Sequence, residues 1–179
     1  MKKLLMILPL VLVLCFMVGC QDKATMAELE EFKAQAEVEE QNKAMVQRIL
    51  AEGDKRGAVI LDEVCTTDYK MYWPSNAEPI NLEEHKELWQ AFITAFPDLA
   101  HTIDEIIADG DIVSTRETVR GTHKGEFQGI PPTGKQFAMS AICLWRFKDG
   151  KLVEYRADGD MLGMMQQLGM ELKPKEAEK

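Results

Sequence analysis

The stretch KQFAMSAICLWRFKDGKLVEYRADGD, residues 135–160, decides the fold class. Two strand-like runs flank KDGK at 148–151, which has the composition of a tight hairpin turn. Residues 136–147 carry apolar side chains at odd and at even positions, so a strand here presents an apolar surface to both faces of its sheet. Helices are expected to cover one face. A second subunit is a natural cover for the other; a central place in a strongly curved sheet is the alternative.

Working outward from this hairpin, the sequence predicts further strands and, before them, helices. In the best-signalled helix, Asn81 and Glu84 have the spacing of a capping box and Pro97 stops the helix. A helix through residues 45–52 is expected to end at Gly53. The remaining predicted elements are a short helix at 56–64, a strand at 69–73, strands at 99–109 and 111–123 joined by DGD, and a Met-rich helix after residue 160. Helices followed by hairpin-linked strands predict an α+β domain with helices on one face of an antiparallel sheet.

The N-terminus predicts export. Lys2 and Lys3 precede the apolar run LLMILPLVLVLCFMVG, which is shorter than the roughly 20 residues of a membrane span and is typical of a signal peptide. The run ends in MVGC, which resembles the lipobox of bacterial lipoproteins, so Cys20 is expected to carry lipid. An ordinary signal peptide cleaved near Gly19 is the alternative. The expected location is the cell envelope, lipid-anchored on the extracytoplasmic side; Gln21 favours the outer membrane in a Gram-negative host.

Four segments follow from these patterns. They are a lipoprotein signal peptide at 1–19, a charged helical stalk or disordered tether at 20–44, a folded domain at 45–172 and a charged tail at 173–179. The net charge of −9, without a basic cluster in the domain, argues against nucleic acid as a partner. His and Cys residues lack the spacing of metal ligands, so no metal is expected. Cys143 lies in an apolar strand pattern and is expected to be a buried thiol; Cys65 and Cys143 need not be bridged.

Five motifs then occur in order: AFPDL, GDIVSTR, RGTHKGEFQGIPPTGK, DGKLVE and DMLGMMQQLG. Together they resemble the SnoaL-like polyketide cyclase family, often labelled ester cyclases, of the nuclear-transport-factor-2-like superfamily. The resemblance covers roughly residues 45–170. It implies a cone-shaped α+β barrel, in which a curved antiparallel sheet packs against three to four helices around an apolar pocket. It also implies a homodimer and chemistry without metal or organic cofactor.

The resemblance further implies an intramolecular aldol ring closure in which an Asp before the last helix acts as acid and base. Asp160 matches that position, and Arg156 stands where the family often has Trp. His123, at a strand end, is the second catalytic candidate, and its alternative is a purely architectural role. Candidate substrate-binding residues, chosen from strand faces and aromatic content, are Arg116, Glu117, Tyr72, Trp73, Trp89, Trp145 and Arg156.

Residues 121–137 predict a shaped connection between neighbouring strands, in which Gly125 and Gly129 provide positive φ or close backbone approach. His85 is expected on the polar side of its helix, and His101 at the surface. The sequence thus predicts a lipid-anchored domain that binds a small apolar or carbonyl-containing molecule and possesses cofactor-free acid–base chemistry. A non-catalytic ligand carrier or an adaptor is the alternative. A desolvated carboxylate inside the pocket distinguishes the enzyme from the carrier, and an adaptor predicts a filled cone without a cavity.

Overall fold

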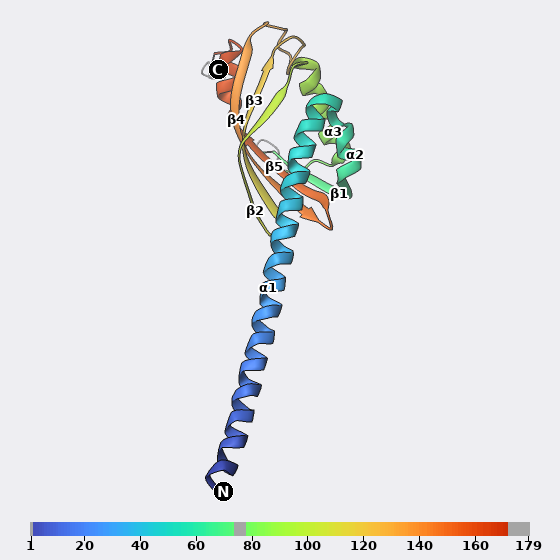
Figure 1. Ribbon diagram of the computed structural model, residues 1–179. Helices are drawn as coiled ribbons and strands as arrows, with labels where there is room; N and C mark the ends of the chain where they lie inside the picture. Colours follow the sequence, from blue (N-terminus) through green and yellow to red (C-terminus); the bar gives the residue numbers. More distant parts are fainter. Residues whose placement is uncertain (1, 74–77, 172–179) are drawn as a thin grey trace, which may run out of the picture. The chain divides into compact units, whose positions relative to one another are not determined.

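The computed structural model describes the backbone of residues 2–73 and 78–171 and the side chains of residues 23–73 and 78–171 (Figure 1). The chain divides into two compact units, Met1–Val38 and Glu39–Lys179. Helix α1, Lys2–Arg56, begins in the first unit. Within the residues whose side chains are described, no helix carries an apolar stretch long enough to cross a membrane. The predicted lipobox at Cys20 lies outside those residues.

The second unit is built on a five-stranded curved sheet with the order β1-β5-β4-β3-β2 (Figure 1). Its elements are η1 (Gly57–Val59), α2 (Ile60–Val64), β1 (Cys65–Tyr72), α3 (Leu82–Ala95), β2 (Ala100–Asp109), β3 (Ile112–Thr122), β4 (Gln136–Lys148), β5 (Lys151–Gly159) and α4 (Met161–Gln167). This arrangement confirms the predicted α+β class.

The sheet departs from the prediction in one respect. Strands β2 to β5 are antiparallel neighbours, but β1 pairs with β5 in parallel, and the sheet is not closed into a barrel. Hairpin turns signal antiparallel pairing only between strands that follow each other directly. The partner of β1 lies far along the chain, with Cys65 opposite Leu152, so no local turn signals the direction of that pair.

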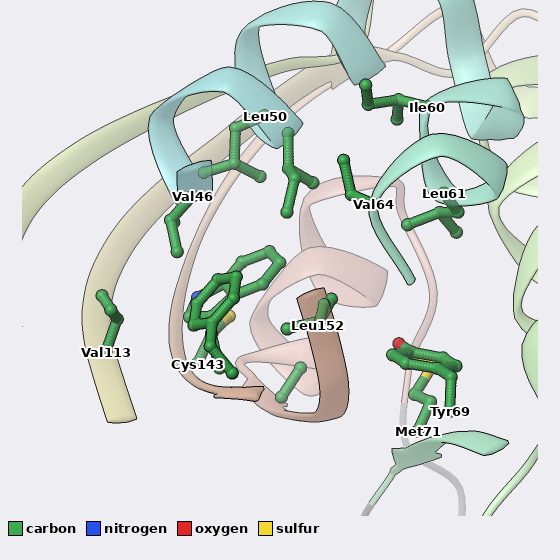
Figure 2. Close-up of a cluster of buried hydrophobic side chains, with 14 of the residues drawn as sticks. Val46, Leu50, Ile60, Leu61, Val64, Tyr69, Met71, Val113, Cys143 and Leu152 are labelled. Carbon is green, nitrogen blue, oxygen red and sulfur yellow. The ribbon is translucent and has the colours of Figure 1, made fainter. Parts of the chain in front are cut away.

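Strand β4 is covered on one face within the single chain. Its odd-numbered side chains from Phe137 to Phe147 are buried, whereas Ile142 and Leu144 on the other face are 57% and 42% exposed. The chain's own helices therefore cover one face, as expected, and the second subunit predicted to cover the other face stays a prediction. The inner face meets a core formed with α1 and α2, shown in Figure 2.

The helices follow their local signals except at Gly53. Asn81 and Glu84 form the predicted capping box at the start of α3, with Glu84 Oε2 accepting the Asn81 backbone N–H at 2.8 Å. Helix α1 continues past Gly53 to Arg56, and Gly57, at φ +70°, follows its end. Gly53 stays helical because the Trp89 indole packs directly on it: a Cβ at that position would lie 2.3 Å from Trp89 Cζ2.

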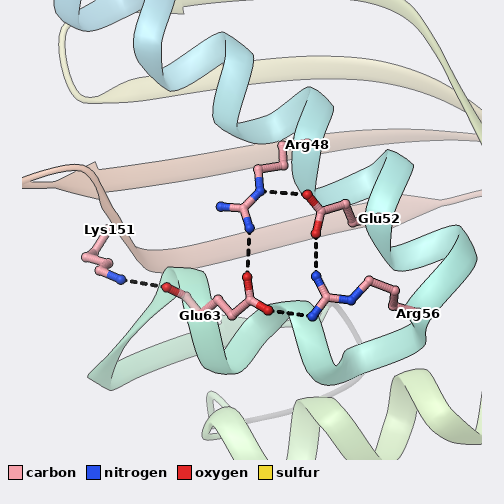
Figure 3. A network of polar contacts seen from close by, with 5 residues as sticks. All are labelled: Arg48, Glu52, Arg56, Glu63 and Lys151. Carbon is pink, nitrogen blue, oxygen red and sulfur yellow. Dashed lines mark hydrogen bonds and ion pairs between the residues drawn. The ribbon is translucent and has the colours of Figure 1, made fainter.

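An exposed ion-pair network joins α1 to α2 (Figure 3). Arg48 and Arg56 both bridge Glu52 to Glu63, at distances of 2.5 to 2.8 Å. The guanidinium groups hold the pKa of both carboxyls below its usual range. Exposed pairs contribute little individually, but four of them in one network fix the angle between the two helices that cover the core.

Two glycines of the connection at 121–137 have the architectural roles predicted for them. Gly125 lies against the end of α3, where a Cβ would meet the Thr94 carbonyl oxygen at 2.3 Å, and its N–H donates to the Ala95 carbonyl at 3.0 Å. Gly129 has φ +79° in a tight turn closed by hydrogen bonds between Phe127 and Ile130. The two glycines thus serve the two purposes expected of them.

Candidate functional site

A pocket of about 110 Å³ lies between α1, α3 and the inner face of the sheet. Its walls are mainly apolar and aromatic, and they include the predicted residues Trp73, Trp89, Trp145 and Glu117. Among the described residues that line it there is no Lys or Arg. The polar groups in the wall come from Glu117, two histidines, Tyr155 and Cys143, so the chemistry of the pocket rests on very few side chains.

Glu117 points inward because alternate residues of β3 share a face. Glu117 is only 1% exposed. The Thr115 hydroxyl donates to Glu117 Oε1 at 2.5 Å and accepts from the Trp145 indole N–H at 3.0 Å. Burial raises the pKa of the Glu117 carboxyl, and the Thr115 hydrogen bond opposes that rise. The site therefore holds the desolvated carboxylate that an acid–base enzyme needs.

Asp54 and His101 form a pair at the same wall. His101 begins β2 and lines the pocket, and its Nδ1 lies 2.6 Å from Asp54 Oδ1. The His101 backbone N–H also donates to Asp54 Oδ2, at 2.9 Å. Because a carboxylate only accepts hydrogen bonds, Nδ1 carries the proton and Nε2 of the neutral ring has a free lone pair. This arrangement suits a general base, since Asp54 stabilises the imidazolium that forms.

His85, on α3, is buried and also lines the pocket. Its Nδ1 lies 2.8 Å from the Tyr69 hydroxyl, and its ring is nearly parallel to that of Tyr155, with 5.6 Å between centroids. Burial lowers the pKa of His85 to about 4, so the ring is neutral at ordinary pH. The predictions of a solvated His85 and a surface His101 are both wrong.

Cys143 contributes a thiol rather than a nucleophile. Its Sγ lies 3.2 Å from the Tyr155 hydroxyl, on the inner face beside Glu117. Burial raises the pKa of Cys143 to about 12, which keeps it protonated. Cys65 is also a free thiol, so Cys65 and Cys143 do not form a disulfide.

Comparison with known proteins identifies the family. The model of the SnoaL-like polyketide cyclase family matches residues 43–168. This chain belongs to that family. Aklanonic acid methyl ester cyclase DnrD of Streptomyces peucetius is 37% identical over 76 residues, which cover 42% of this chain and 52% of the relative. The chain thus spans about half the length of the curated relatives it matches.

Solved structures of the same fold extend the likeness. AclR of Streptomyces galilaeus, a proposed hydroxylase, is 30% identical with a TM-score of 0.68, covering 79% of this chain and 87% of its own. IdmH of Streptomyces antibioticus, a proposed polyketide cyclase, is 32% identical with a TM-score of 0.64, covering 72% of this chain and 99% of its own. Because their proposed activities differ, the fold alone does not assign the reaction.

In this SnoaL-like domain, Asp160 caps α4. Its Oδ1 accepts the Gly163 backbone N–H at 2.8 Å, its side chain is exposed, and it is not among the residues that line the pocket. A Cβ at position 163 would overlap the Asp160 carboxylate, so the missing side chain of Gly163 makes room for the cap. The geometry describes an N-cap; the catalytic role of Asp160 stays a prediction.

His123 is fully buried against Phe96 and is not among the residues that line the pocket. Its Nδ1 lies 3.1 Å from the Thr133 hydroxyl, and its ring packs 5.3 Å from that of Phe96. Its Nε2 has no hydrogen-bond partner among the described residues. These contacts fit an architectural role for His123 in the 121–137 connection. Its catalytic role also remains a prediction.

Three other candidates, Arg116, Arg156 and Tyr72, are not among the residues that line the pocket. Arg116 is on the outer face of β3, where it pairs with Asp104 and Glu105 at 3.3 Å each. Arg156 packs over the Tyr72 ring, with 3.9 Å between its Cζ and the ring centroid. Strand alternation explains both arginines, because even-numbered residues of β3, and those of β5 from Glu154 onward, point away from the core.

Proposed function

We propose that this domain binds a small, apolar carbonyl compound and catalyses cofactor-free proton transfer at the carbon next to the carbonyl. Ring closure of a polyketide ester is the overall reaction we favour. One observation carries the proposal: an imidazole base, His101 held by Asp54, faces an apolar pocket beside the buried carboxyl of Glu117. The names of the curated relatives, which are ester cyclases, support the substrate class.

The proposed reaction begins at His101. Its Nε2 takes the α-hydrogen as the C–H bond breaks; that electron pair becomes the enolate C=C bond, and the carbonyl π pair moves to oxygen. The α-carbon then attacks a second carbonyl carbon of the same molecule and forms the new C–C bond. The imidazolium returns its proton to the resulting alkoxide. No oxidant or reductant is consumed.

Glu117 assists the first step. In its ionised form, the Glu117 carboxylate favours the imidazolium of His101 by attraction between opposite charges. Thr115 holds the carboxylate by a hydrogen bond from its hydroxyl. The lack of Lys or Arg among the described lining residues favours an uncharged ligand, such as an ester or ketone, over a carboxylate. Apolar aromatic walls supply the binding surface.

The proposed place of action is the envelope, through lipid at Cys20, which the sequence motif supports. A non-catalytic carrier is the second candidate function. It is favoured by the wall itself, in which Tyr155, Trp145 and Cys143 are already engaged with protein groups. In a carrier, the pocket supplies shape and apolar contact without a proton transfer.

The test is deuterium exchange at the α-carbon of aryl ketones and β-keto esters, beginning with acetophenone, followed by NMR in deuterium oxide. Removing the base in His101→Gln or its partner in Asp54→Asn is expected to slow exchange by at least about 100-fold. Glu105→Gln, on the outer face, is the matched control and should exchange at the wild-type rate.

Two outcomes contradict this proposal. Ligand binding without exchange in the wild type favours the carrier. If Asp160→Asn abolishes exchange while His101→Gln does not, the acid–base role belongs to Asp160, as the family resemblance implies.

A further inference from the structure

We propose that His85 donates a hydrogen bond from its Nε2–H to the carbonyl oxygen of the bound ligand. The class of the ligand rests on the proposed function; the tautomer on which the donation depends does not. His85 lines the pocket, and its Nδ1 is occupied by Tyr69. Nε2 is therefore the ring nitrogen left to meet a ligand.

The tautomer follows from the surroundings of Tyr69. That residue is 2% exposed, and burial raises the pKa of its hydroxyl well above the usual value, so the hydroxyl keeps its proton. Among the described residues, His85 Nδ1 is the hydrogen-bond partner recorded for that hydroxyl. If Nδ1 carried the proton, the hydroxyl hydrogen would be buried without an acceptor, which is unfavourable. Tyr69 therefore donates, and the proton of His85 sits on Nε2.

Packing holds the imidazole in one orientation. Its ring is within 10° of parallel to both Tyr69 and Tyr155, with centroid distances of 5.8 and 5.6 Å, and Trp89 lies 5.9 Å away at 27°. Burial favours the neutral ring. A neutral imidazole with a fixed N–H is a hydrogen-bond donor that does not change with pH across the physiological range.

The two histidines of the pocket are thus complementary. Asp54 accepts from Nδ1 of His101 and leaves a lone pair on its Nε2, whereas Tyr69 donates to Nδ1 of His85 and leaves a proton on its Nε2. One ring accepts the α-hydrogen, and the other stabilises the oxygen on which negative charge develops. Enolate formation needs these two groups together.

The competing interpretation is that His85 only links α3 to β1 in the core. Heteronuclear NMR of the imidazole nitrogens in the ligand-free protein tests the tautomer without any turnover. We expect a protonated Nε2 and an unprotonated Nδ1, unchanged between about pH 5.5 and 8. In Tyr69→Phe this preference should be lost. A protonated Nδ1 in the wild type overturns the proposal.

The second test follows the carbonyl stretch of isotope-labelled acetophenone by infrared spectroscopy. Binding to the wild type should lower the stretching frequency; His85→Met should abolish that shift and weaken binding about tenfold. His85→Gln, whose side-chain amide keeps a donor near the place of Nε2, should retain part of the shift.

A double variant keeps the test valid if His85→Met unfolds. Tyr69→Phe combined with His85→Met leaves no hydroxyl without an acceptor, so its thermal melt should be closer to wild type. An equal carbonyl shift in the wild type and in this variant, or no shift in the wild type, overturns the proposal. A lowered frequency without deuterium exchange would retain His85 as a donor while removing the catalytic proposal.

Discussion

Burial decides what each titratable side chain of the pocket contributes. The wall lowers the pKa of His85, and it raises the pKa of Glu117 and of Cys143. All three shifts favour the uncharged form, as expected where apolar groups replace water. Asp54 and His101, by contrast, are paired and partly open, with side chains 20% and 15% exposed. The proposed base thus keeps an access to solvent that the other three side chains lack.

The raised pKa of Glu117 gives a signed stability prediction. When the folded state binds the proton more tightly than the unfolded state, stability falls as pH rises between the two pKa values. Glu117→Gln removes this loss while Thr115 keeps an oxygen to donate to. We expect the variant to gain stability relative to wild type at about pH 8 and to gain little at about pH 4, measured by urea unfolding. A gain independent of pH would contradict a desolvated carboxyl.

The lowered pKa of His85 predicts the opposite dependence of folding stability on pH. Its folded-state pKa is about 4, below the usual value of 6.5 for a histidine side chain. The unfolded chain therefore binds the proton first, and stability is lost as pH falls from about 6.5 to 4. This loss amounts to about 3 kcal/mol. His85→Gln should show a flatter acid limb in urea unfolding followed across that window, while an unchanged limb would place the titrating group elsewhere.

Residue patterns located part of the site. The alternation of side chains along β3 groups Glu117 with Val113 and Val119, and the structure places this group on the inner face. His85 was misplaced although it falls three residues after Leu82 and four before Trp89, which puts it on the apolar side of α3. The Asp54–His101 pair joins residues 47 positions apart on α1 and β2; no local spacing signals it, because it exists only once those elements pack.

At the scale of elements, the local sequence predicted helix ends and hairpin turns better than it predicted which strands pair. The capping box of α3 and the hairpin glycines, Gly110 at φ +59° and Gly150 at φ +73°, are determined by neighbouring residues. The parallel pairing of β1 with β5 and the passage of α1 through Gly53 are determined by contacts distant in sequence. Those two features escaped prediction for that reason.

Gly53 also tests how α1 and α3 meet at the pocket. An alanine inside a helix normally stabilises it by about 1 kcal/mol relative to glycine. Here a Cβ would lie 2.3 Å from Trp89 Cζ2, so Gly53→Ala should instead destabilise by about 1–3 kcal/mol and displace the indole from the pocket wall. Urea unfolding and tryptophan fluorescence measure both effects. Ala51→Gly, at an exposed position of the same helix, reports the propensity effect alone. A more stable Gly53→Ala would show that Trp89 does not pack there.

At the scale of the molecule, the two units present different open questions. Lipid attachment at Cys20 stays a prediction, because the residues that carry it lie outside the described side chains. In the second unit, the outer face of the sheet carries a row of paired residues across four strands: Ile107, Ser114, Leu144 and Arg156. Ile107 is 69% exposed. With Ile142 and Leu144 it leaves an apolar surface uncovered by the chain's own helices.

We expect this outer face to pair two copies of the chain. A twofold interface brings the same surface of both copies together. The surface is suited to that, since Ile142 at its apolar centre is flanked by Arg116 on β3 and by Asp158 on β5. Burying apolar side chains that are half exposed in the monomer supplies the driving force. Substituting Ile142→Lys places a charge at the centre of the proposed interface and should yield monomers.

Light scattering on the chain from Gln21 onward, at tens of micromolar protein, measures the oligomeric state of the wild type and of Ile142→Lys. The comparison requires that the wild type is a dimer at this concentration. Val59→Lys is the matched control, because Val59 is 55% exposed on η1, away from the sheet face, and its substitution should leave the dimer intact. A wild type that is monomeric at this concentration refutes the interface. A dimer that survives Ile142→Lys but dissociates in Val59→Lys would move the contact to the helical side, where it would lie beside the pocket rather than behind it.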